Sequence, residues 1–266
     1  MIGVIGCGNM ASAIVKGIHS TFSEIKFYTF TPSYTRAHQL AQKVCGQAVR
    51  NLSELSACEI LIIACKPQQF SELARELTAA VPLSGKLIIS IMAALSTERI
   101  SQELGTSLIT RVMPNTPAVA SLGVSLVFHS PAVSIDLQKK VESYFSACSS
   151  VHVLGSEELF DKATVVTGSG PAYVYYFAKT MVDSLVEWGV DANEARVMVT
   201  QLFKGSSALM ELSSDKTISS LIDEVTSKGG VTICAIDSYR SEDLSGITQR
   251  ALKAAYQRSK DLQASL

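Results

Sequence analysis

A glycine-rich turn joins the first apolar run of this chain to the helical pattern that follows it. The stretch "MIGVIGCGNMASAI" places Gly6, Gly8 and Ala11 in the pattern G-x-G-x-x-A. Between a strand and a helix, the first glycine permits a tight turn, the second lets a pyrophosphate approach the backbone, and the third small residue allows close packing. The helix then offers free N–H groups and its positive dipole end to phosphates. We therefore expect dinucleotide binding here, although a plain strand–helix turn would leave the same pattern.

Short apolar runs alternate with helical patterns as far as residue 155. Strands are expected at Ile2–Ile5, Lys26–Phe30, Ile60–Ala64, Leu87–Ile91, Leu108–Val112, Val124–Phe128 and Val151–Leu154. Helices are expected between them at Asn9–Ser20, Ser33–Val44, Gln68–Ala80, Thr97–Leu104 and Ile135–Cys148. This alternation predicts a mostly parallel sheet with helices on both faces. Residues 1–155 are thus expected to form a Rossmann-type, doubly wound domain that binds a dinucleotide.

Residues 156–266 show helical periodicity and no further strand-like runs. Helices are expected at Pro171–Trp188, from Asp191 onward, at Ile218–Val225, at Val231–Tyr239 and at Ser245–Asp261. They are richer in apolar residues than a small monomeric bundle needs, so we expect part of them to pack against another subunit. The predicted fold class is therefore α/β, with an N-terminal Rossmann-type doubly wound sheet followed by an all-helical dimerisation domain.

Composition argues against several classes of protein. A net charge of −1 is unlike the basic excess of a nucleic-acid-binding protein. No run of apolar residues is long enough for a membrane span, and no secretory signal is evident. The six cysteines form no C-x-x-C motif and stand at no zinc spacing with histidine, so we expect no metal site. They are interpreted as reduced thiols of a cytoplasmic protein.

The end of the second expected strand bears on which dinucleotide binds. An NAD-preferring site usually has an acidic residue there that holds the ribose 2′-hydroxyl. The stretch "FYTFTPSYTR" has no Asp or Glu and instead offers the hydroxyls of Thr31 and Ser33 and the guanidinium of Arg36. Such groups suit a 2′-phosphate. We expect NADP(H) to be preferred, with NAD(H) left open; Arg36 could also be only a solvated helix residue.

Further candidate residues follow other strands, at the edge where open α/β sheets bind ligands. The stretch "ACKPQ" puts Lys66 and Pro67 there, and "SIMAAL" puts Met92, Ala93 and Ala94 there. Small residues would let a ribose or nicotinamide lie close to the backbone. The stretch "RVMPNTP" brings Asn115 toward the same crevice.

A second glycine-rich turn, "VTSKGGVTICAID" at residues 225–237, lies within the helical half. Two glycines, a lysine and three hydroxyl residues run directly into a helix-like stretch. A turn that opens a helix presents backbone N–H groups and a positive dipole end, which together can bind a carboxylate. A tight connection between two helices would need no ligand.

Six motifs in one order give the chain a family resemblance. They are "GCGNMASAI", "ACKPQ", "SIMAAL", "RVMPNTPA", "TGSGPAYVYYF" and "VTSKGGVT", which together extend over essentially the whole sequence. In these motifs the chain resembles the pyrroline-5-carboxylate reductases, which reduce a cyclic imine with NAD(P)H. The resemblance implies reduction of 1-pyrroline-5-carboxylate to L-proline, the last step of proline biosynthesis. It also implies a helical domain that intertwines with a partner subunit, in dimers that commonly assemble further into decamers.

The resemblance carries site residues over motif by motif. It implies cofactor contacts at Gly6, Cys7, Gly8, Asn9, Met10, Thr31, Pro32, Ser33, Asn51, Ala64, Cys65, Lys66, Pro67, Met92, Ala93 and Ala94. Arg36 is a further expected cofactor contact, because its guanidinium suits a 2′-phosphate. The resemblance implies substrate contacts at Val225, Ser227, Gly229, Gly230 and Thr232. Thr232 is the expected catalytic residue, as a hydrogen-bonding group near the imine nitrogen.

The chain departs from the family pattern at Lys228, where proline is usual, because loss of proline restores an N–H and loosens the turn. This leaves open a reductase of a related cyclic imine or a non-catalytic NADPH-binding paralogue. A β-hydroxyacid dehydrogenase is disfavoured, since the helical half lacks the G-x-x-x-K-x-x-N pattern of that class.

Overall fold

The computed structural model describes residues 1–266 and contains one sheet of eight strands. The strands are β1 (Ile2–Ile5), β2 (Phe27–Phe30), β3 (Gln47–Ala48), β4 (Ile60–Ile63), β5 (Leu87–Ser90), β6 (Ile109–Pro114), β7 (Gly123–His129) and β8 (Ser149–Val153). Their order is β3-β2-β1-β4-β5-β6-β7-β8. Neighbouring strands run parallel except β6 and β7, which pair antiparallel. The predicted, mostly parallel sheet is confirmed, and only the two-residue β3 was not foreseen.

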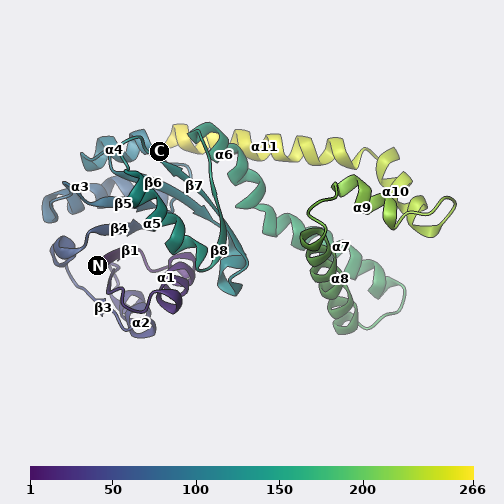
Figure 1. Cartoon of the computed structure of the whole chain (residues 1–266), viewed down its shortest axis with the longest axis horizontal. Helices are drawn as coiled ribbons and strands as arrows, with labels where there is room; N and C mark the ends of the chain where they lie inside the picture. Colours follow the sequence, from purple (N-terminus) through teal and green to yellow (C-terminus); the bar gives the residue numbers. More distant parts are fainter. The chain divides into compact units, whose positions relative to one another are not determined.

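Helices cover both faces of this sheet (Figure 1). Side chains of α1 (Asn9–Thr21), α2 (Thr35–Lys43) and α5 (Ile135–Ser146) share one buried apolar cluster. On the opposite face, α3 (Phe70–Ala80), α4 (Thr97–Leu104) and the 3₁₀ turn η1 (Leu52–Ala57) form the other cluster. The central strands β1 and β4 are buried throughout, as expected for parallel strands covered on both sides. Two more 3₁₀ turns, η2 (Pro67–Gln69) and η3 (Thr116–Ala120), follow β4 and β6.

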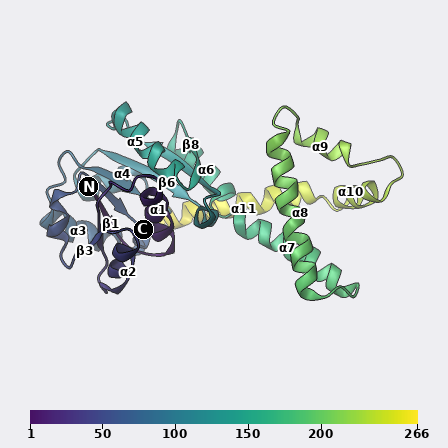
Figure 2. The same ribbon diagram turned by 60° about the horizontal axis from the view of Figure 1, so that its bottom comes forward.

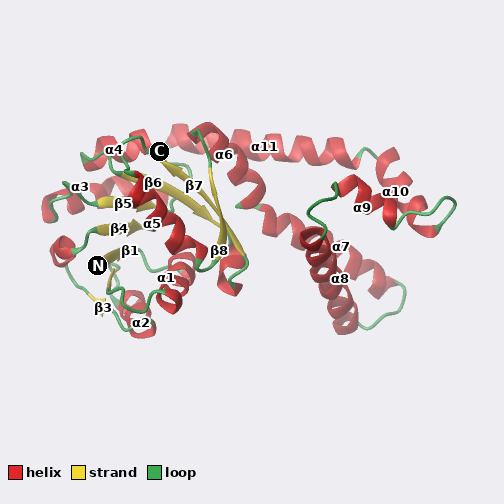
Figure 3. Cartoon of the chain, in the orientation of Figure 1, coloured by secondary structure: helices red, strands yellow, loops and turns green.

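Only helices follow β8 along the chain (Figure 3). They are α6 (Glu157–Thr167), α7 (Gly170–Glu187), α8 (Ala192–Leu212), α9 (Ile218–Glu224), α10 (Val231–Ser241) and α11 (Leu244–Ser265). Asp191 caps the start of α8, as predicted: its carboxylate accepts the N–H groups of Asn193 at 2.9 Å and Glu194 at 3.2 Å. The periodicity of the sequence predicts no separate helix at α6. No helix of the chain is both long and apolar enough to cross a membrane.

The chain forms two compact units. One contains Met1–Pro171 together with Ala255–Leu266, and the other contains Ala172–Ala254. Within the first unit, the end of α11 lies beside α4 and α6: Arg99 donates to the carbonyl of Leu266 at 3.2 Å, and Lys260 reaches Asp161 at 3.3 Å. The predicted boundary fell at residue 155, where the repeating strands end.

The second unit has little buried interior of its own. Its buried apolar residues are Ala195 and Val199, whereas large apolar side chains are exposed on its helices. Tyr176 is 74% exposed and Trp188 is 78% exposed. Exposed apolar surface on this scale is typical of helices that pack against another subunit.

Candidate functional site

The first glycine-rich turn has the geometry of a phosphate-binding loop. Gly6 follows β1 with a φ of +94°, a conformation that favours glycine. A Cβ atom on Gly6 would lie 2.7 Å from both the carbonyl carbon and oxygen of Ala64. The turn therefore packs directly against the backbone that follows β4, and no side chain fits at Gly6.

Gly8, unlike Gly6, faces open space. It is the N-cap of α1, where no side chain caps the helix. A Cβ atom on Gly8 would have no neighbour within 4 Å, so the space in front of the helix is open. Free N–H groups at an uncapped helix N-terminus, facing open space, fit a pyrophosphate.

The end of β2 supplies groups that suit a ribose phosphate. The hydroxyl of Thr31 is buried and has no hydrogen-bond partner, which is rare for a buried polar atom. Arg36, in the first turn of α2, lines a groove of about 710 Å³ together with Cys7 and Asn9. The groove lies between α1 and α2, which both views place side by side (Figures 1 and 2). Its lining includes three cationic residues, Lys16, Arg36 and Lys43, and no acidic one.

Arg50 is a cation at this edge that sequence reasoning missed. Its guanidinium lies 4.1 Å from the ring centre of Tyr34. Tyr34 directly follows the predicted cofactor residues Thr31–Ser33 in the sequence. Asn51 follows it, and the backbone N–H of Asn51 is held at 2.9 Å by the Glu54 carboxylate. The position of Arg50 next to Asn51 was the only signal in the sequence.

The segments that follow β4 and β5 touch each other. The thiol of Cys65 lies 3.4 Å from the sulfur of Met92. Burial raises the pKa of the Cys65 thiol to about 11 and that of Cys7 to about 12. Both cysteines therefore stay protonated near neutral pH and act as packing groups, not nucleophiles. Lys66 is exposed and forms no ion pair. In the segment after β5, Ala94 adopts a φ of +58°.

The residues predicted to bind the cofactor come from one edge of the sheet. Gly6–Met10 follow β1, Thr31–Arg36 follow β2, Asn51 follows β3, Ala64–Pro67 follow β4, and Met92–Ala94 follow β5. These strands are consecutive neighbours, and they run parallel. Asn115 differs, because both ends of its amide are engaged internally, with the N–H of Val124 at 2.8 Å and the carbonyl of Thr167 at 3.0 Å.

The second glycine-rich turn, in the other unit, also leaves donors free. Gly229 has a φ of +73°, and Gly230 is the N-cap of α10 with no side-chain cap. A Cβ atom on Gly230 would collide with the hydroxyl oxygen of Ser227. The Thr232 hydroxyl is exposed and forms no hydrogen bond, and Lys228 forms no ion pair. The start of α10 thus combines uncapped N–H groups with a free hydroxyl, the features of a helix N-terminus that can bind a small anion.

Comparison with known proteins identifies the family. The family model for pyrroline-5-carboxylate reductase dimerisation matches residues 157–262, and the model for coenzyme F420-dependent NADP oxidoreductases matches residues 1–94. The pyrroline-5-carboxylate reductase of Pasteurella multocida is 30% identical over 265 residues, which cover 97% of this chain and 96% of that protein. The chain belongs to the pyrroline-5-carboxylate reductase family. The Synechocystis reductase is 31% identical, with 98% of this chain and 97% of that protein covered.

Solved structures of this reductase family share the fold. A Coxiella burnetii pyrroline-5-carboxylate reductase superposes with a TM-score of 0.88 at 28% identity, covering 98% of this chain and 97% of that one. The Plasmodium falciparum enzyme, solved with NADP bound, gives a TM-score of 0.84 at 28% identity, with 98% and 97% covered. The dimerisation model begins at Glu157, the first residue of α6.

The sequence did not indicate a buried polar network that joins β6, α6 and α4. Arg111 of β6 is 1% exposed and pairs with Glu157 and Asp161 of α6, at 2.6 Å and 3.1 Å. Glu157 in turn binds Thr97 at the start of α4. The partners are 46 and 60 residues apart in sequence, so no local pattern could indicate them.

Proposed function

We propose that this chain reduces 1-pyrroline-5-carboxylate to L-proline with NADPH, the last step of proline biosynthesis. The observation that carries the proposal is the open, uncapped start of α10 beside the free Thr232 hydroxyl. That feature suits a small ring bearing a carboxylate, in a chain whose relatives over nearly its full length are pyrroline-5-carboxylate reductases.

The cofactor edge is proposed to hold NADP(H) through the residues predicted from the sequence. The first turn of α1 and the backbone of Gly6–Met10 would bind the pyrophosphate. Thr31, Ser33 and Arg36 would bind the 2′-phosphate, since the unpartnered Thr31 hydroxyl offers a hydrogen bond and no acidic residue opposes the charge. Ala64–Pro67 and Met92–Ala94 would contact the ribose and nicotinamide. When bound, the cofactor supplies the hydride.

The substrate is proposed to contact Val225, Ser227, Gly229, Gly230 and Thr232. N–H groups at the start of α10 would hold the carboxylate, with a further hydrogen bond from the Ser227 hydroxyl. Thr232 would hydrogen-bond near the imine nitrogen and orient the ring. A protonated imine accepts hydride readily, so positioning carries the catalysis and no dedicated general acid is needed.

Self-association is proposed to cover the apolar helices of the second unit. The chain contains the family's dimerisation region, and Tyr176, Trp188 and Leu202 are exposed there in a single chain. Further assembly of such dimers into a decamer is proposed from the family resemblance. All six cysteines are free thiols, which fits a reducing, cytoplasmic compartment.

The reaction is tested by following NADPH absorbance with purified protein, with and without 1-pyrroline-5-carboxylate, and again with NADH. Substrate-dependent oxidation that is faster with NADPH is expected. Thr232→Ala should lower turnover by roughly ten- to a few hundred-fold, the scale of a lost hydrogen bond of about 1.5–3 kcal/mol. Thr226→Ala is the matched control, because the Thr226 hydroxyl is already engaged by the Ile222 carbonyl at 2.5 Å.

One alternative is a reductase of a different cyclic imine, because Lys228 stands where the family usually has proline. This lysine stands in the turn without an ion pair and adds a positive charge beside the proposed carboxylate site. A six-membered imine carboxylate should therefore be assayed in parallel. Faster turnover of that ring would reassign the substrate, and NADPH binding without turnover of either imine would indicate a non-catalytic paralogue.

A further inference from the structure

We propose that Glu157 is a positioning residue for cofactor binding, acting through Thr97 on the loop Met92–Ser96. The inference rests on the proposed reductase function, in which Met92–Ala94 contact the nicotinamide half of the cofactor. Glu157 itself belongs to α6, at the start of the family's dimerisation region, and no sequence motif assigns it a role.

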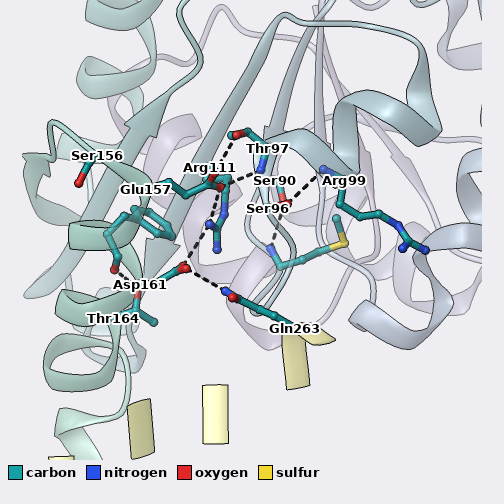
Figure 4. A network of polar contacts seen from close by, with 12 residues as sticks. Ser90, Ser96, Thr97, Arg99, Arg111, Ser156, Glu157, Asp161, Thr164 and Gln263 are labelled. Atoms are coloured by element: carbon teal, nitrogen blue, oxygen red, sulfur yellow. Dashed lines mark hydrogen bonds and ion pairs between the residues drawn. The ribbon is translucent and has the colours of Figure 1, made fainter. Parts of the chain in front are cut away.

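Glu157 holds the start of α4 with both of its carboxylate oxygens (Figure 4). One oxygen accepts the Thr97 N–H at 2.7 Å, and the other accepts the Thr97 hydroxyl at 2.9 Å. Thr97 is the first residue of α4, and Ser96 before it caps the helix by accepting the Arg99 N–H at 3.1 Å. Glu157 thus places a negative charge at a helix N-terminus, where the helix dipole favours it.

Charge pairing fixes the position of Glu157. Its carboxylate receives Arg111 at 2.6 Å, and the Arg111 side chain is only 2% exposed. Arg111 also lies over the ring of Phe160, 4.4 Å from its centre, and pairs with Asp161. Asp161 is held from α11 by Gln263 at 2.8 Å and by Lys260. A buried guanidinium needs these partners, so Glu157 has little freedom to move.

The loop between β5 and α4 needs such an anchor. Ala94 has a φ of +58°, which a residue other than glycine adopts at a cost and keeps only where its surroundings enforce it. At the β5 end, the Met92 N–H donates to the Ser90 hydroxyl at 3.3 Å. In the middle, Leu95 is buried, and at the far end Glu157 holds Thr97. Releasing the far end should let Ala93 and Ala94 leave the conformation that meets the cofactor.

Thr97→Pro tests the contact with little other disturbance. Proline is tolerated at the first position of a helix, and Ser96 already has the extended backbone, with a ψ of 158°, that a following proline requires. The variant removes both donors to Glu157 and leaves the Arg111 pairs in place. We expect the NADPH dissociation constant, measured by calorimetric titration, to rise about tenfold, which is about 1.4 kcal/mol. Thr97→Ser keeps both donors and should bind NADPH like the wild type.

Glu157→Ala tests the other side of the contact. It should weaken NADPH binding by a similar factor, and Glu157→Gln should largely restore binding because its amide oxygen still accepts the Thr97 N–H. Glu158→Ala is the control in the same turn of α6, because Glu158 pairs only with Lys162 at the surface. A role confined to stability would lower the unfolding temperature of both Glu157 variants and leave the dissociation constant unchanged, which would overturn the proposal.

The double variant Thr97→Pro with Glu157→Ala separates a shared contact from two independent effects. If both changes act through one contact, NADPH binding weakens no further than in either single variant. Additive weakening, or wild-type binding by Thr97→Pro, overturns the inference. Should Glu157→Ala not fold, Thr97→Pro alone decides. Because NADPH binding needs no imine, a wild type that binds NADPH and fails to reduce pyrroline-5-carboxylate would reject the proposed function while leaving this test intact.

Discussion

The two glycines of the first turn should respond in opposite ways to the same small substitution. A methyl group on Gly6 would lie 2.7 Å from the Ala64 carbonyl and 2.9 Å from the Cys65 nitrogen, in a residue with a φ of +94°. All of these neighbours are backbone atoms between β4 and η2, so they cannot turn aside as a side chain can. A methyl group on Gly8 would meet nothing within 4 Å.

The magnitudes follow from those neighbours. Gly6→Ala combines a strained φ with overpacking, each of which costs about 1–3 kcal/mol, so the fold should lose roughly 2–6 kcal/mol. For a protein of this size, a loss of about 3 kcal/mol lowers the unfolding temperature by roughly 6–12 °C. Gly8 has a φ of −74° that alanine adopts freely, but alanine is a poorer N-cap than glycine, so Gly8→Ala should cost about 0.5–1 kcal/mol of stability. Its methyl group, however, would occupy the space proposed for the pyrophosphate.

The test measures the unfolding temperature and the NADPH dissociation constant on the same samples of each variant. We expect Gly6→Ala to lose both stability and cofactor binding. Gly8→Ala should lose little stability but weaken binding by about ten- to a hundredfold, or about 1.4–2.8 kcal/mol. Wild-type NADPH affinity in Gly8→Ala would refute the placement of the pyrophosphate at the start of α1. Wild-type stability in Gly6→Ala would refute the packing argument.

Three further outcomes are expected. Arg36→Ala should raise the Michaelis constant for NADPH about ten- to a hundredfold and that for NADH much less, since the lost charge-assisted hydrogen bond is worth about 1.5–3 kcal/mol; equal effects would reject the 2′-phosphate assignment. Burial lowers the pKa of His129 from 6.5 to about 4, so the unfolded chain takes up its proton first. Stability should therefore fall as pH drops from about 6.5 to 4, by up to about 3 kcal/mol, and urea unfolding of His129→Phe should lose that slope. Leu202→Glu, on an exposed apolar face of α8, should shift the mass measured by light scattering from a dimer or larger assembly toward the monomer.

Prediction of the sheet succeeded where the pattern is local. Strands β1, β4 and β5 are short apolar runs buried on both faces, and their signal lies within four residues each. The antiparallel direction of β7 left no such signal, because strand direction depends on how the chain returns after η3. Strand β3 has two residues, Gln47 and Ala48, which is too short for any periodicity.

The candidate site likewise contains features with a local sequence signal and features without one. The convergence of the proposed cofactor residues at one edge of the sheet could be predicted, because parallel strands place their carboxyl ends together. The pairing of Arg111 with Glu157 could not be predicted, since an arginine inside an apolar strand and a glutamate at a helix start each have a common solvated interpretation. The pair forms only when β6 and α6 pack together, which leaves Arg111 1% exposed.

The helix α6 explains why the helical pattern and the compact units divide the chain at different residues. Periodicity changes at residue 155, where the alternation of strands and helices ends. The first compact unit nevertheless extends to Pro171, because Glu157 and Asp161 of α6 are tied to Arg111 within the sheet. The last residues of α11 join that unit through the same Asp161 carboxylate. Both stretches that lead into the second unit are thus anchored to one buried arginine, and Glu157 extends that anchor to the loop proposed to meet the cofactor. Substitutions in α6 should therefore be assayed for NADPH affinity as well as for dimer stability.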